Sequence, residues 1–125
     1  HRAAVEARRV GRERAVGAVF RRMRGGAQRA EVRFDGLAGC LRTPRGGSSR
    51  QTLLVIDNGA VRSRLISPRE AARLMGLPDS YQLPRSQTAG LQVMGDGVAV
   101  PVVRWLAETL LAPLVDSKTA SLAAE

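Results

Sequence analysis

Arginine is the side chain through which this chain could do most of its chemistry. The 125 residues hold 20 lysines and arginines against 11 acidic residues, a net charge of +9, and Lys118 is the only lysine. Guanidinium groups bind phosphate and guanine through two parallel hydrogen bonds. The composition therefore favours a polyanionic partner. The competing interpretation is that the arginine content reflects a GC-rich genome.

Other side chains exclude several kinds of site. Cys40 is the only cysteine and His1 the only histidine, which argues against a disulfide within the chain, a cysteine-based metal site or a Ser-His pair. We interpret Cys40, in Ala-Gly-Cys-Leu, as a small apolar core residue. No apolar run is expected to span a bilayer and no signal peptide is recognisable. The sequence therefore predicts a cytoplasmic protein with no metal and no membrane partner.

The clearest candidate contact surface is a loop at 42–51. Its glycines let backbone amides approach a ligand, and its hydroxyls and guanidinium groups can donate to phosphates or base edges. A dispensable polar loop is the alternative. We predict nucleic-acid-binding residues here and in the basic strand before it: Arg42, Thr43, Arg45, Gly46, Gly47, Ser48, Ser49, Arg50 and Gln51, with Arg22 and Arg24.

Strands and turns are expected to position this loop. Residues 17–24 and 28–34 alternate in polarity and predict two strands separated by Gly25-Gly26. Their arginines would lie near one another, which is costly unless an anion neutralises them: Arg21, Arg22, Arg24, Arg29 and Arg33. Residues 52–56 and 61–65 predict a hairpin, because Asn58-Gly59 between them favours a two-residue type I′ turn.

A short helix over 67–75 follows the hairpin. Ser67 can cap it and Glu70 completes a capping box. Pro68 suits the first helical position, since it lacks only an N–H that would be unpaired there. Gly76 is expected to end the helix, and Pro78 prevents it from restarting.

The C-terminal part should contain the longest helix. Residues 89–94 predict a short helical turn and 95–97 a turn. From Pro101 to Pro113 apolar residues recur at helical spacing, and such a wide stripe requires a surface to pack on.

The expected organisation of the whole chain is a basic helix at 1–16, a central unit at 17–94, the turn and helix at 95–114 and a tail at 115–125. The helix at 1–16 starts abruptly, which suggests that it belongs to a larger domain. Its basic surface is interpreted as solvated, with a phosphate-facing surface as the alternative. The fold class predicted is α+β: a small twisted sheet with basic loops, one short capped helix and a long amphipathic C-terminal helix.

Two motifs carry a family resemblance. Residues 64–81, Arg-Leu-Ile-Ser-Pro-Arg-Glu-Ala-Ala-Arg-Leu-Met-Gly-Leu-Pro-Asp-Ser-Tyr, resemble motif nine of the DNA cytosine-5 methyltransferases. Residues 95–102, Gly-Asp-Gly-Val-Ala-Val-Pro-Val, resemble their motif ten, Gly-Asn-x-Val-x-x-Pro-Val. The resemblance is specific over 36–114, looser over 17–34 and unsupported before Gly17. It implies the C-terminal part of such an enzyme, containing the target-recognition region.

The resemblance implies roles for matched residues. Motif ten lies beside S-adenosylmethionine in the family, which suggests cofactor contacts by Gly95, Asp96, Gly97 and Val98. Asp96 replaces the usual asparagine, so a donated bond is lost while acceptance remains. Motif nine is mainly structural in the family, with arginines near DNA phosphate, and its matches are Arg64, Ser67, Pro68, Arg69, Glu70, Arg73, Gly76, Pro78 and Asp79.

The family's catalytic motifs have no counterpart in these 125 residues. The Pro-Cys nucleophile, the Glu-Asn-Val motif and the glycine-rich cofactor loop are not found. We therefore expect a DNA-recognition segment, inactive alone, of an enzyme that methylates C5 of cytosine in duplex DNA. The alternatives are a free-standing DNA-binding module descended from such an enzyme, or a basic structural protein. The apolar C-terminal helix predicts either docking to a catalytic domain or self-association.

Overall fold

The computed structural model describes residues 2–12, 14–43 and 50–115. The predicted contact residues Arg45 to Ser49 and most of the predicted tail, 116–125, lie outside these ranges. The elements in chain order are α1 (Arg2–Val10), β1 (Ala15–Arg24), β2 (Ala27–Arg33), β3 (Thr52–Asp57), β4 (Ala60–Leu65), α2 (Pro68–Leu74), α3 (Gln87–Asp96) and α4 (Val100–Leu106), which continues into the π-helical segment η1 (Ala107–Leu111). The α+β class is confirmed.

The four strands form one antiparallel sheet in the order β2-β1-β3-β4. Both predicted hairpins are present. Asn58 and Gly59 adopt φ of 49° and 82°, the positive values that a type I′ turn requires. Gly25 and Gly26 connect β1 to β2, also with positive φ. The pairing of β1 with β3 joins the two hairpins through residues more than thirty positions apart, such as Gly17 opposite Leu54.

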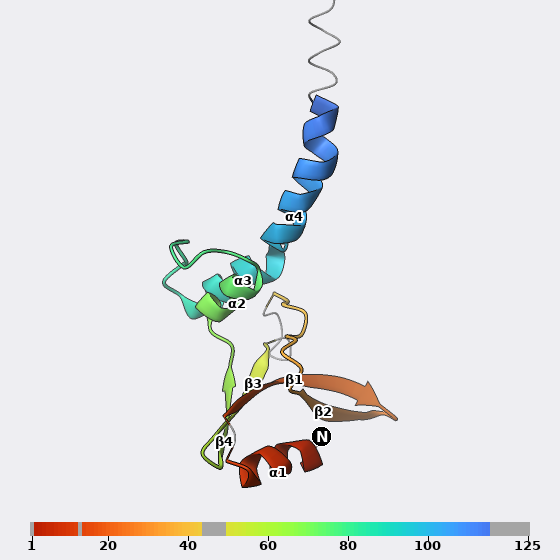
Figure 1. Ribbon diagram of the computed structural model, residues 1–125, viewed down its shortest axis with the longest axis vertical. Coiled ribbons are helices and arrows are strands. Elements are labelled where there is room, and N and C mark those ends of the chain that lie inside the picture. Colours follow the sequence, from red (N-terminus) through yellow and green to blue (C-terminus); the bar gives the residue numbers. More distant parts are fainter. Residues whose placement is uncertain (1, 13, 44–49, 116–125) are drawn as a thin grey trace, which may run out of the picture.

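Helices lie on both sides of this sheet (Figure 1). On one side α1 covers the sheet, with the Arg8 guanidinium 4.5 Å from the ring centre of Phe34. Ile56 is fully buried. Glycine suits position 17, because a Cβ there would lie 2.7 Å from the Val32 side chain. On the other side α2 and α3 form a small core, with buried residues Ile66, Ala71, Ala72, Leu91 and Met94.

Several expectations need correction at the level of elements. The helix expected over 1–16 ends at Val10, because Ala15 and Val16 pair with β3. The short turn expected at 89–94 is the ten-residue helix α3, capped by the Ser86 side chain. Gly95 and Asp96 are therefore helical, and the backbone becomes extended only at Gly97.

Pro113 does not end the last helix, which continues to Val115. Proline cannot donate a hydrogen bond and its ring clashes with the carbonyl four residues earlier in an α-helix. The wider π-helical turn just before it relieves this conflict, with the Ala112 N–H donating to the Ala107 carbonyl. The Thr109 hydroxyl donates to the carbonyl of Trp105, which keeps that oxygen satisfied.

Two expectations about side chains also need correction. Cys40 is exposed rather than part of a core, because the chain at 38–43 runs along the surface without regular structure. The expectation that the five strand arginines lie together holds only in part: Arg22 is opposite Arg29 in the register, but the five do not all share one face of the sheet. Arg21 is at an odd position of β1, whereas Arg24 is at an even one, so their side chains leave opposite faces of the sheet.

Candidate nucleic-acid interface and its supporting helix

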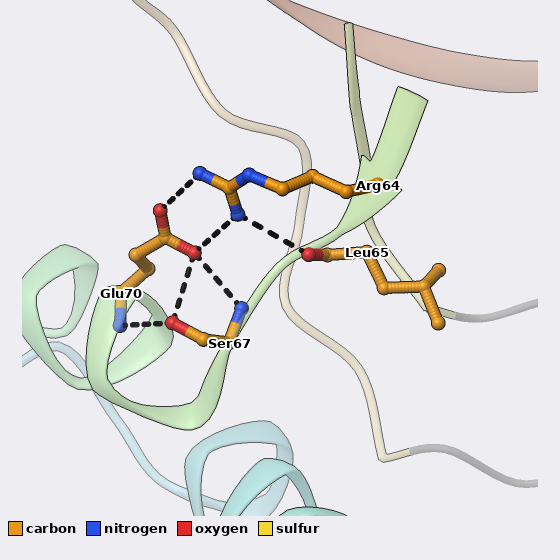
Figure 2. Close-up of polar contacts among 4 residues, drawn as sticks. All are labelled: Arg64, Leu65, Ser67 and Glu70. Atoms are coloured by element: carbon orange, nitrogen blue, oxygen red, sulfur yellow. Dashed lines mark hydrogen bonds and ion pairs between the residues drawn. The ribbon is translucent and has the colours of Figure 1, made fainter. Parts of the chain in front are cut away.

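The start of α2 is held by a closed set of hydrogen bonds (Figure 2). The Ser67 hydroxyl accepts from the Glu70 N–H at 3.2 Å, and the Glu70 carboxylate accepts from the Ser67 N–H at 2.9 Å. These two bonds confirm the predicted capping box. The Arg64 guanidinium adds two bonds to the same carboxylate, at 2.8 and 2.6 Å. The last strand of the sheet is thereby connected to the first turn of α2.

This arrangement favours the charged form of Glu70. The Arg64 guanidinium is the largest cause, and the Ser67 N–H and hydroxyl also contribute. Partial burial opposes them, but together they lower the pKa of Glu70 from an ordinary 4.5 to about 2. The carboxylate therefore remains ionised over the physiological range, and its role is to hold the helix start.

The other two motif-nine arginines also bond within the chain. Arg69 donates to the Tyr81 carbonyl at 2.8 Å, and more weakly to the carbonyl of Pro78. Arg73 makes two bonds to the Asp79 carboxylate, at 2.7 and 2.9 Å. Each of these interactions fastens the segment after α2 back onto the helix. The geometry supports a structural use of these guanidinium groups.

Close backbone contacts fix α2 against its neighbours. Gly76 ends the helix with φ of 78°, as the sequence predicted, and a Cβ there would lie 2.4 Å from Pro101. The Val100 N–H donates to the Met75 carbonyl at 2.9 Å. Gly90 of α3 similarly receives the ring of Pro68. The motif-nine helix therefore directly contacts the start of the motif-ten helix.

A polar pocket of about 210 Å³ lies at the base of the predicted contact loop. Three arginines line it, Arg21 from β1 and Arg42 and Arg50 from the two sides of the loop. Within the described residues, none of the three forms an ion pair, although Arg50 donates to the Thr88 hydroxyl at 3.5 Å. The remaining lining residues are Val19, Phe20, Cys40, Gln51 and Thr52. Three cations around one open pocket are suited to a phosphate or another anion.

The side chains of Arg24 and Arg33 do not line this pocket. Arg24 lies 3.0 Å from Glu31, on the other face of the sheet from Arg21. Arg33 pairs with Asp35 and stacks on the Phe20 ring at 5.7 Å. Arg22 is opposite Arg29 in the register of β1 and β2. Sequence reasoning did not select Arg21 as a contact residue, because its position relative to Arg42 and Arg50 depends on the pairing of β1 with β3.

The four residues of the predicted cofactor edge divide into two pairs. Gly95 and Asp96 are turned toward the loop base: a Cβ at Gly95 would lie 2.3 Å from the Thr43 nitrogen, and Asp96 accepts from the Thr43 hydroxyl at 2.5 Å. Gly97 and Val98 are exposed, with Val98 retaining 66% of its accessible surface. The same short stretch therefore contacts the base of the predicted contact loop and presents an apolar side chain to the surroundings.

The C-terminal helix extends away from the rest of the molecule (Figure 1). None of the residues of α4 or η1 is buried, and Trp105 keeps 61% of its surface exposed. The exposed apolar side chains are Val102, Val103, Trp105, Leu106, Leu110, Leu111, Leu114 and Val115. The apolar stripe predicted from the sequence thus has no packing surface within the described part of the chain.

The stretch Gln87–Val115 is long and apolar enough to cross a membrane by length and composition. This corrects the expectation that no run approaches that length. It is weak evidence for a membrane span, because the backbone leaves the helix at Gly97 and resumes at Val100. The helix from 100 to 115 is roughly 24 Å long at 1.5 Å per residue, below the ~30 Å hydrocarbon core. In the ranges that the structure describes, no group of three potential metal ligands is present.

The fold and the site thus define a small basic α+β unit with an arginine-lined pocket and an unpartnered apolar helix. Residues 10–112 match the model of the C-5 cytosine-specific DNA methylase family, and the chain belongs to this family. The match begins before Gly17, where the motifs alone gave no support.

Individual relatives point the same way. The chain is 43% identical to the type II methyltransferase M.NlaX of Neisseria lactamica over 49% of its length, which covers 20% of that protein. It is 40% identical to M1.ScrFI of Lactococcus lactis subsp. cremoris over 52% of its length and 17% of the relative. It is 35% identical to M.HpaII of Haemophilus parainfluenzae over 64% of its length and 26% of the relative. The chain thus spans about a fifth of the length of these relatives. No solved structure matches it.

Proposed function

We propose that this chain is the C-terminal recognition segment of a DNA cytosine-5 methyltransferase of a restriction-modification system, working in the cytoplasm. The complete enzyme would transfer a methyl group from S-adenosylmethionine to C5 of cytosine in duplex DNA. The observation that carries the proposal is the cluster of Arg21, Arg42 and Arg50 around one open pocket, in a chain whose family acts on DNA. These guanidinium groups bind the DNA backbone and place the loop at 42–51 in a groove.

The residues at 95–98 form one edge of the cofactor pocket in this proposal. Whether these residues fit the cofactor is judged from the chemistry of their polar and apolar groups. Asp96 Oδ1 accepts from the Thr43 hydroxyl, and the second carboxylate oxygen can accept a hydrogen bond from an ammonium or hydroxyl group, both of which S-adenosylmethionine carries. The exposed Val98 side chain offers an apolar surface beside it. These residues fit an edge of the cofactor, which supplies the methyl group, and the chain provides orientation there.

The chemical step belongs to residues outside this sequence. The family's nucleophile is a cysteine that follows proline and adds to C6 of the flipped cytosine. Cys40 follows glycine and is exposed beside the arginine pocket, so we assign it no catalytic role. The segment alone is inactive, and α4 docks its apolar side chains on the catalytic part. Burial of each leucine-sized side chain there contributes roughly 1.5–3 kcal/mol.

Reconstitution tests the proposal. The 125-residue chain is mixed or joined with a chain that carries the Pro-Cys and Glu-Asn-Val motifs, and transfer of labelled methyl from S-adenosylmethionine to duplex DNA is measured. We expect no transfer by either chain alone and transfer by the two together. Duplex binding without any rescue of transfer would instead support a free-standing DNA-binding module. If the chain neither binds duplex DNA nor rescues methyl transfer, both the recognition-segment proposal and the DNA-binding-module alternative are contradicted.

The exposed helix gives a second, independent test. Without the catalytic part, α4 should bury its apolar surface against a second copy. Sedimentation should show dimers or larger species of the chain alone. Addition of the catalytic part should convert them into a 1:1 complex of the chain with the catalytic part. Leu106→Glu and Leu110→Glu should weaken both associations, whereas Arg62→Gln, on β4, should leave them unchanged. A strictly monomeric chain that also fails to bind a catalytic part would contradict the assigned role of α4.

A further inference from the structure

Both ends of the predicted DNA loop rest on the same helix. Thr43, at the N-terminal end of the loop, donates its hydroxyl to the carboxylate of Asp96, the last residue of α3, at 2.5 Å. Arg50, at the other end, reaches Thr88 in the first turn of α3 at 3.5 Å. The short contact is therefore at the C-terminal end of α3, where the motif-ten residues begin.

The backbone is as close as the side chains at this end. A Cβ at Gly95 would lie 2.3 Å from the Thr43 nitrogen and 2.4 Å from the Arg42 carbonyl carbon. Real Cβ atoms do not approach backbone that closely, so only glycine allows the loop base to lie on the helix here. The glycine is not needed for helix conformation, because its φ is not positive. Its absent side chain serves the contact with 42–43.

We propose that Asp96 and Gly95 position the DNA-recognition loop by fixing Thr43 on the end of α3. One oxygen of Asp96 is committed to Thr43, so the residue joins the loop to the turn that leads into α4. A carboxylate suits this role because its oxygens only accept, and the Thr43 hydroxyl can donate. Arg42, adjacent to Thr43, is thereby held at the pocket with Arg21 and Arg50.

The inference rests on the proposed DNA-binding function only for its consequence, because the contact itself is measurable without DNA. Backbone order parameters of Arg42 and Thr43 report it directly by NMR. In the unmodified chain we expect order parameters of about 0.85, typical of rigid backbone, and in Thr43→Val a fall to about 0.6. Thr43→Ser, which keeps the hydroxyl, should restore the order. Thr88→Val is the matched control, since it removes the longer contact, and should change these two residues little.

A second variant separates loss of the hydrogen bond from loss of the fold. Gly95→Ala keeps the Thr43 hydroxyl and favours helix, yet its methyl displaces the loop base. We expect the same loss of order at Arg42 and Thr43 with α3 intact. Unchanged order parameters in both Thr43→Val and Gly95→Ala would overturn the inference.

Duplex affinity then tests the consequence. Thr43→Val should weaken binding several-fold without changing its salt dependence, since no phosphate contact is removed. Arg42→Gln should reduce the slope of log K against log salt by about 1. Lost order with unchanged affinity would show that the contact exists but does not position a DNA-binding loop. An unmodified chain that does not bind duplex would count against the proposed function, while the order parameters would still decide the contact.

Discussion

Two groups of arginines in this protein differ in their hydrogen-bond and ion-pair partners. Around α2, Arg64, Arg69 and Arg73 each bond to a carboxylate or carbonyl of the chain. Around the pocket, Arg21, Arg42 and Arg50 form no ion pair with another described residue. The same side chain thus holds the fold together in one region and remains available for a partner in the other. Changes near α2 should therefore cost stability, and changes at the pocket should cost binding.

The largest expected effect on stability is at the end of α2. Gly76→Ala places a methyl group against Pro101 and forces a side chain into positive φ, so we expect a loss of about 3 kcal/mol in the free energy of unfolding. Urea denaturation measures it. Gly25→Ala is the matched control, because Gly25 also has positive φ but nothing lies within 4 Å of its Cβ position. It should lose only about 1 kcal/mol. Equal losses would show that the contact with Pro101 contributes nothing.

The second effect concerns the Arg64–Glu70 pair. Glu70→Gln should lower the free energy of unfolding by about 1 kcal/mol at pH 7, an estimate discounted for the exposure of the pair to solvent. The folded-state pKa of Glu70, about 2, lies below its ordinary value of 4.5. The carboxylate therefore contributes stability that is fully present above about pH 5 and is lost as pH falls toward 2.

Denaturation at several pH values provides the control for this prediction. The difference between the unmodified chain and Glu70→Gln should shrink as the pH is lowered from 5 to 2. A difference that stays constant over this range would mean that ionisation of Glu70 does not stabilise the fold.

The smallest effect on stability is expected at the pocket. Arg42→Gln should change the free energy of unfolding by no more than about 0.5 kcal/mol, because the guanidinium has no ion-pair partner among the described residues. Thermal or urea unfolding of this variant beside Glu70→Gln makes the comparison direct. A loss as large as that of Glu70→Gln would remove the distinction between the two groups of arginines.

Local features were predictable from the sequence because their causes are local. The Ser67 capping box, the Gly76 helix end and the Asn58-Gly59 turn all follow from residues within a few positions of one another. The two motifs at 64–81 and 95–102 predict the family from the sequence alone, and the family match over residues 10–112 confirms it. What the sequence did not reveal depends on distant pairing: β1 beside β3, which places Arg21 next to Arg42 and Arg50, and the contact of Gly95 and Asp96 with Thr43.

Two misassignments have the same physical origin. Gly95-Asp96-Gly97 was predicted to be a turn because glycines flank an aspartate, but the helix ends only where the backbone becomes extended at Gly97. The predicted apolar stripe ends at Pro113, yet the last helix continues to Val115, because the π-helical segment before the proline accommodates its ring. In both cases the composition marks a position where a helix can end, and the hydrogen bonds of the surrounding turns decide whether it does.

The salt dependence of duplex binding tests the central claim most directly. The slope of log K against log salt should be steep for the unmodified chain and lower by about 1 in each of Arg21→Gln, Arg42→Gln and Arg50→Gln. Arg62→Gln, an exposed arginine on β4 away from the pocket, should keep the original slope. Pocket variants that keep the slope of the unmodified chain would contradict the assignment of the pocket as the DNA contact, and a reduced slope in Arg62→Gln would place the contact elsewhere.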